Sequence, residues 1–251
     1  MNVPYLAESG VSMTFFLRRA LSSTLAGTLT IAVSTIGLLG TVAVLPARAL
    51  PLEQVAARLA SVPVYVLGNE NSLLLLSTEE NADSASLFVF MSPDRAKAFM
   101  ESNPEVSEGN QIVAVNLAEL YKQSRAQQEQ PLRLTFVPEE AEATQAAELS
   151  SDYKGGVPLF YAQLADGSPI PSVPAEGGEA EAVIPMFFSS DDLESNLNAL
   201  GQSNPEARAA ISIGVVPLES LIGQLQSQDE ELFNRIRLLP DSDIVRSISG
   251  S

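Results

Sequence analysis

The stretch that decides the fold is LFVFMSPD, residues 87–94, because it joins a buried strand directly to a helix. Five apolar residues in a row, residues 87–91, are typical of a strand that is buried on both faces. Ser92 is a preferred N-cap, Pro93 suits the first helical position, and Asp94 places an anion where the helix dipole favours one. We therefore expect the chain to turn from strand to helix at Ser92.

The same pattern occurs again 97 residues later, as VIPMFFSSDD at residues 183–192. Other segments match in the same order, with offsets that rise slowly from 95 to 102: 62–65 with 157–160, 112–115 with 211–216, and 133–138 with 235–240. Such an ordered series is not expected by chance. It predicts two repeated halves, residues 51–150 and 156–251, joined by residues 151–155.

Each half shows the order strand, strand or loop, strand, helix, strand, helix, strand, helix. Hairpins in this mixed order indicate an α+β fold. Because one half alone buries little apolar surface, we expect the two halves to form one compact unit with a shared core about a pseudo-twofold axis. A short amphipathic helix at 52–59 opens this unit. The Pro- and Gly-rich residues 165–182 stand in place of the second half's middle strand and are expected to form a surface loop.

The composition excludes several classes of enzyme, because the 251 residues include no His and no Cys. A Ser-His-Asp triad, an imidazole base, a thiolate nucleophile and a zinc site with His or Cys ligands cannot be built. Asp191 and Asp192 could act as acid and base or bind a metal, but adjacent acids at a helix start more often serve as cap and dipole partner. The acidic runs at 139–142 and 229–231 lack the spaced ligands and turn glycine of a calcium loop. We therefore predict no catalytic residues, no cofactor and no metal.

The chain is strongly acidic, with a formal net charge of −17. Residues 1–49 hold three of the 14 basic residues and one of the 31 acidic ones, so the rest of the chain has a net charge of −19. A field this negative repels nucleic acid and anionic lipid. It attracts basic, acid-poor polypeptides, of which organelle-targeting presequences are one kind. The alternative is that the charge serves solubility alone.

Residues 1–49 have the layout of a secretory signal peptide. Two arginines at 18–19 precede an uncharged run, and Ala47-Arg48-Ala49 is a small-x-small triplet of the kind that signal peptidase cuts. The run is long enough to span a bilayer, so an uncleaved anchor is the alternative. Because Ser and Thr residues dilute the run and Pro46 breaks it, we expect cleavage and no stable membrane insertion afterwards.

Four segments together resemble one known family: VPVY at 62–65, SPD at 92–94, VPLF at 157–160 and IPMFF at 184–188. These segments, which follow the leader, resemble the twenty-two-kilodalton subunit of the translocon at the inner chloroplast envelope. Because the leader is of the bacterial type, the chain resembles the cyanobacterial members of that family most. The resemblance covers residues 52–251. It implies a periplasmic protein, placed in the intermembrane space in plastid relatives, that holds precursor polypeptides and passes them to outer-membrane assembly or import machinery. It implies no catalytic residues.

The candidate client-binding groove is an apolar set drawn from both halves: Val62, Phe88, Phe90, Val157, Phe187 and Phe188. Strands this apolar are usually buried on both faces, so a plain core is the competing interpretation. Exposed apolar patches, by contrast, bind segments of unfolded chain. Because side chains alternate along a strand, Phe88 and Phe90 must share a face, whereas Phe187 and Phe188 must point in opposite directions.

Three functions remain open at this point. The first is a periplasmic holdase, whose apolar grooves contact unfolded or precursor polypeptides while its negative field attracts basic segments and keeps the complexes in solution. The second is a non-catalytic structural adaptor that docks on the periplasmic domains of the outer-membrane barrel-assembly protein. The third is an enzyme that uses carboxylates, which would need two acids converging in a pocket.

Overall fold

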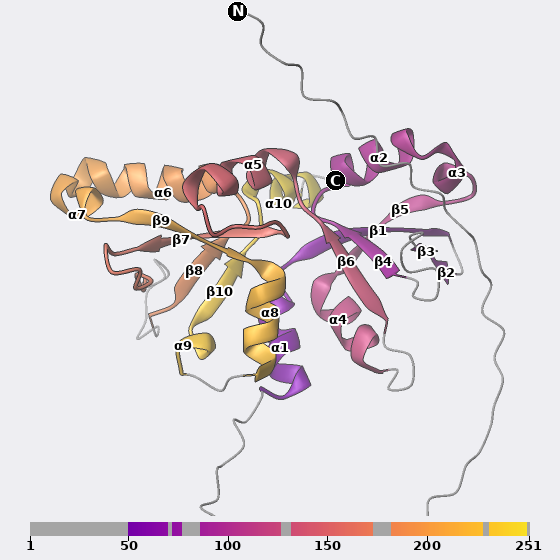
Figure 1. The fold of residues 1–251 in the computed structure, drawn as a ribbon, viewed down its shortest axis with the longest axis horizontal. Helices are drawn as coiled ribbons and strands as arrows, with labels where there is room; N and C mark the ends of the chain where they lie inside the picture. The colour runs from indigo at the N-terminus through magenta and orange to yellow at the C-terminus, as the bar shows by residue number, and fades with distance from the viewer. Residues whose placement is uncertain are drawn as a thin grey trace, which may run out of the picture.

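The computed structural model describes residues 50–69, 72–76, 86–126, 132–172, 182–227 and 231–249. Its strands form two sheets, one from each half of the chain, and helices pack against them (Figure 1). This mixture of sheets and helices confirms the predicted α+β class. The predicted leader lies outside the described residues. No described helix has the length and apolar character needed to cross a membrane.

The first sheet has six strands: β1 (Pro63–Asn69), β2 (Ser72–Leu73), β3 (Leu75–Leu76), β4 (Ser86–Phe90), β5 (Gln111–Asn116) and β6 (Arg133–Val137). β1 pairs antiparallel with β5 on one side and with β4 on the other, and β6 lies parallel to β4. The main order is therefore β5-β1-β4-β6. The short strands β2 and β3 pair with the end of β1 and the start of β4.

The second sheet has four strands: β7 (Pro158–Gln163), β8 (Ile184–Phe187), β9 (Ser212–Pro217) and β10 (Ile236–Leu239). Their order is β9-β7-β8-β10; β7 is antiparallel to both β9 and β8, whereas β8 is parallel to β10. The register agrees with that of the first sheet, since Tyr65 pairs with Phe90 there and Phe160 pairs with Phe187 here. The two sheets therefore share one plan of strand pairing.

The described part of the segment predicted as a surface loop makes two isolated bridges at the edge of the second sheet. Pro169 bridges Gln163 at the end of β7, and Ser172 bridges Val183 just before β8. β2 and β3 make the corresponding pairs in the first sheet. Residues 165–168 and 171–172 are exposed, in agreement with the predicted surface loop, and the two pairs are isolated bridges outside the strands. Residues 173–181 of the segment lie outside the described residues.

The described helices are α1 (Leu52–Leu59), α2 (Pro93–Ser102), α3 (Pro104–Ser107), α4 (Leu117–Ala126), α5 (Glu140–Leu149), α6 (Ser190–Ser203), α7 (Pro205–Ala209), α8 (Leu218–Ser227), α9 (Glu231–Asn234) and α10 (Ser242–Ser249). The predicted turn from strand to helix after β4 is confirmed, because the Ser92 hydroxyl accepts the Arg95 N–H at 3.0 Å. After β8, the Ser189 hydroxyl accepts the Asp192 N–H at 3.3 Å in the same way. Each such cap stabilises its helix by about 1 kcal/mol.

One hydrophobic core contains residues of both halves. It combines the inward-facing side chains of β1, β4, β7, β8 and β10 with the buried faces of α1, α4 and α8. Two smaller clusters lie on the outer faces of the sheets, one under α2 and α3 and the other under α5 and α6.

Two helices pack on the sheet of the opposite half. α5 follows the last strand of the first sheet, yet it packs against β7 and β9 of the second sheet (Figure 1). α10 follows the last strand of the second sheet, and its Ile244 packs against the outer cluster of the first sheet. This exchange brings the beginnings of α5 and α10 to the junction of the two halves.

Candidate functional site

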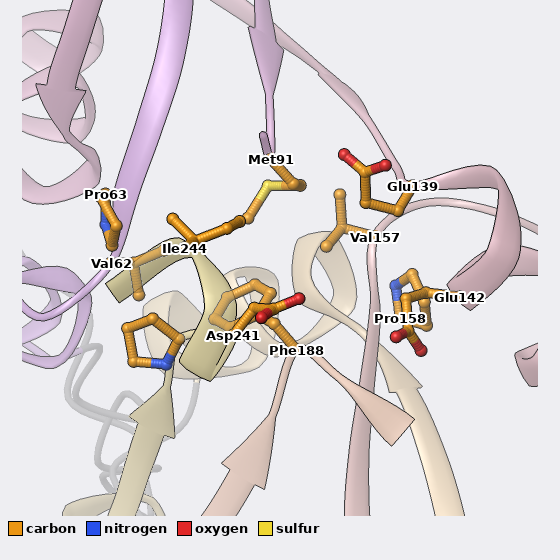
Figure 2. Close-up of a pocket in the computed structure, with 11 residues that line it drawn as sticks. Val62, Pro63, Met91, Glu139, Glu142, Val157, Pro158, Phe188, Asp241 and Ile244 are labelled. Carbon is orange, nitrogen blue, oxygen red and sulfur yellow. The ribbon is translucent and has the colours of Figure 1, made fainter. Parts of the chain in front are cut away.

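A hollow lies where the two halves meet, and both halves contribute to its walls (Figure 2). The gaps between its side chains and the open solvent in its mouth together amount to about 430 Å³. Most of its lining is apolar: Val62, Pro63, Met91, Val157, Pro158, Phe188, Pro240 and Ile244. Three acidic residues complete the lining: Glu139, Glu142 and Asp241.

The apolar wall is formed by residues that directly precede or directly follow the central strands of each half. Val62 and Val157 are buried and directly precede β1 and β7. The Val62 carbonyl accepts the first N–H of α4 at 3.0 Å, and the Val157 carbonyl accepts the first N–H of α8 at 2.8 Å. These two hydrogen bonds fix both residues to the shared core. Met91 and Phe188 directly follow β4 and β8 and extend the wall. Corresponding positions of the two halves therefore enclose the hollow from opposite sides, as Figure 2 shows for the two valines.

The acidic rim comes from the beginnings of the two exchanged helices. Glu139 precedes α5, and its Oε1 accepts the Ser92 hydroxyl at 2.5 Å. Glu142 lies in the first turn of α5, and its Oε2 accepts the Ser190 N–H at 3.0 Å. Asp241 directly precedes α10. The hollow thus combines an apolar wall with carboxylates from both halves.

Burial raises the pKa of the Glu142 carboxyl above its ordinary value. Hydrogen bonds from Ser190 oppose this rise in pKa, and the charges of Asp191 and Asp241 add to it. Because the pKa is higher in the folded chain than in the unfolded chain, the folded chain binds this proton more readily. The ionised form of Glu142 therefore destabilises the fold.

Glu142→Gln is expected to raise the free energy of unfolding at neutral pH, because it removes this charge and keeps an oxygen for the Ser190 N–H. The gain should be fully present above the folded-state pKa and should vanish below the unfolded-state pKa, where the carboxyl is protonated in both states. Thermal unfolding from about pH 4 to pH 8 measures it, with the exposed Glu194→Gln as control. A gain that is equal at every pH contradicts this role of Glu142.

Three of the six residues predicted for the client-binding groove line the hollow: Val62, Val157 and Phe188. The structure does not bring the other three to it. Phe88 and Phe90 lie on the outer face of the first sheet, where their ring centroids are 5.6 and 5.2 Å from that of Phe99. Phe187 is buried in the outer cluster of the second sheet. The predicted alternation is confirmed, because Phe187 and Phe188 belong to clusters on opposite faces.

Of the two adjacent acids considered as a catalytic or metal site, Asp192 connects two helices. The Asp192 carboxylate accepts the N–H and the hydroxyl of Ser242 at 2.9 and 2.7 Å, and so attaches the beginning of α10 to α6. Asp191 is exposed in the first turn of α6. In the part of the chain that the structure describes, no group of three or more acidic side chains is placed to hold a metal ion.

Residues 14–248 match the model of the Tic22-like family. The chain belongs to this family. Protein TIC 22, chloroplastic, from Pisum sativum is 25% identical to it over 192 residues, which are 73% of this chain and 71% of that protein. The family that the sequence resembles is thereby confirmed.

Two solved Tic22 structures share this fold. Anabaena Tic22, a protein of protein transport, matches with a TM-score of 0.65 over 80% of this chain and 98% of that chain, at 24% identity. Tic22 from Plasmodium falciparum matches with a TM-score of 0.59 over 78% of this chain and 96% of that chain, at 16% identity. The arrangement of sheets and helices described above is therefore the Tic22 fold.

The sequence prediction missed the acidic rim of this Tic22-like chain. A signal for it was present, since Pro138-Glu139 corresponds to Pro240-Asp241 at the offset of 102 that already relates the preceding strands. Both segments begin with proline followed by an acid, Glu139 in one and Asp241 in the other. These two acids therefore occupy corresponding positions, just after the last strand of each half.

Proposed function

We propose that this Tic22-like chain is a periplasmic protein that holds precursor polypeptides and passes them to outer-membrane assembly or import machinery. The observation that carries the proposal is the open apolar hollow between the halves. Burial of apolar surface contributes about 25 cal/mol per Å², so such a wall favours apolar segments of an unfolded chain. Membership of the family, and the protein-transport role of the Anabaena relative, support it. The role needs no catalytic residue, cofactor or metal.

The proposal includes the origin of the hollow. Residues 51–150 and 156–251 are two copies of one unit, related by a pseudo-twofold axis and joined by residues 151–155. The common strand order and register of the two sheets support this. Duplication explains why Val62 and Val157 occupy corresponding places around the hollow.

The periplasmic location is the remaining part of the proposal. Residues 1–49 act as a signal peptide that is removed after export, in accordance with the order of arginine pair, uncharged run and small-residue triplet. The net charge of −19 in the rest of the chain then keeps loaded complexes in solution.

Light scattering of an aggregating client tests the proposal. Figure 2 shows the Ile244 side chain reaching into the hollow, so Ile244→Trp should fill part of it. Val245→Trp is the matched control, because Val245 is the next residue of the same helix and is 42% exposed. We expect the unmodified chain and the control to suppress scattering at an equimolar ratio, at low and at moderate salt, and Ile244→Trp to suppress it several-fold less.

Each alternative result has a separate meaning. Failure of the unmodified chain to suppress scattering contradicts the holdase role. If that failure were joined by retention on the periplasmic domains of the barrel-assembly protein, the chain would be a docking adaptor. Equal suppression by the two tryptophan variants would place client binding outside the hollow.

A further inference from the structure

We infer that the hollow selects a lysine or arginine side chain carried on an apolar stretch of polypeptide. The inference rests on the proposed function, because it states what a bound polypeptide must present. It comes from the combination of an apolar wall with an acidic rim, formed by Glu139, Glu142 and Asp241.

The acids of the rim have no cationic partner among the described residues. The ion pairs of that part of the chain lie elsewhere: Arg95 with Glu140, Lys97 with Glu101, Lys122 with Glu53 and Glu119, and Arg246 with Asp243. The hydrogen bonds of the rim come from neutral donors: the Ser92 hydroxyl to Oε1 of Glu139, Ser190 to Glu142, and the Asp243 N–H to Oδ1 of Asp241. Uncompensated negative charge beside an apolar wall favours the entry of a cation.

The arrangement suits a long organic cation better than a metal ion. Figure 2 shows the three carboxylates spread around the apolar side chains, and no group of three acids in the described ranges could hold a metal. Lysine and arginine can lay an apolar stem along a wall while the charged head remains near polar groups. Met91, Phe188 and Ile244 provide such a wall, and the rim lies within the same hollow. An apolar polypeptide with one basic residue therefore matches both parts of the site.

Fluorescence anisotropy with the full chain and labelled peptides tests this selection. The peptides share one apolar sequence and differ only at the central position, which is arginine, lysine, norleucine or glutamate. We expect the two basic peptides to bind about tenfold more tightly than the norleucine peptide, since charge-assisted hydrogen bonds are the strong ones, and the glutamate peptide to bind most weakly.

The triple variant Glu139→Gln/Glu142→Gln/Asp241→Asn removes the charges of the rim and keeps its acceptor oxygens. It should bring the ratio of arginine to norleucine affinity to about one. The control Glu108→Gln/Asp152→Asn/Glu194→Gln changes the net charge equally at exposed positions and should leave the ratio unaltered.

The peptide series on the unmodified chain decides the inference even if the triple variant does not fold. Equal affinity for the arginine and norleucine peptides overturns the selection of a cation and leaves the holding of polypeptides intact. Loss of the ratio in the control variant also overturns it, because the overall field would then be responsible. Absence of binding by every peptide overturns both the inference and the proposed function.

Discussion

Phe90→Ala is expected to lower the free energy of unfolding by about 3–5 kcal/mol, because removal of a large buried ring leaves a cavity that the surroundings fill only in part. The Phe90 side chain is 0% exposed, and its ring centroid lies 5.2 Å from that of Phe99 on α2. Phe90 also pairs with Tyr65 at the point where β4 meets β1. Folded domains are stable by only about 5–15 kcal/mol, so this change removes a large share of the total. Urea unfolding followed by circular dichroism measures the loss.

Phe88→Ala is the matched control for this experiment. Phe88 has the same residue type, strand and face, and its ring centroid is 5.6 Å from that of Phe99, but its side chain is only half-buried. Its replacement should cost less, because a smaller apolar area returns to water and the cavity is partly open. Equal losses would show that the two rings are packed alike in solution, contrary to the structure.

The local elements could be predicted from the sequence because their signals lie within a few residues. Ser92 and Pro93 mark the beginning of α2 without reference to the rest of the chain, and Ser189 marks that of α6. Alternation along the strands likewise placed Phe187 and Phe188 on opposite faces. Pro104 has two local effects: it disfavours a helical conformation for Asn103, where α2 ends, and it suits the first turn of α3.

The hollow could not be predicted in the same way, because it depends on contacts between distant parts of the chain. Nothing near Glu142 or Ile244 in the sequence indicates that α5 and α10 each pack on the sheet of the other half. The bond from Ser242 to Asp192 spans 50 residues, and adjacent acids at a helix start give no sign of it. Helix ends that are far apart in the sequence are therefore brought to one junction by the tertiary fold.

Gly156→Ala is expected to lower the free energy of unfolding by about 2–4 kcal/mol, through backbone strain and the loss of a hydrogen bond. Gly156 has a φ of +90°, a conformation that alanine adopts only with strain. A Cβ atom there would lie 2.6 Å from Oε2 of Glu219, the oxygen that accepts the Val157 N–H at 3.1 Å. The change would therefore displace the carboxylate that fixes the backbone beside the hollow. Thermal unfolding monitored by circular dichroism measures the cost.

Gly155→Ala separates the two contributions. Gly155 has a φ of +115°, but no neighbouring atom lies within 4 Å of its ideal Cβ position, so strain alone should apply and the loss should be smaller. In a Glu219→Ala background the collision and the hydrogen bond are both removed. The two glycine substitutions should then cost nearly the same, because interaction energies between contacting residues vanish when one partner is deleted. If Gly156→Ala remained the more costly change in that background, the excess would have to come from the backbone and not from Glu219.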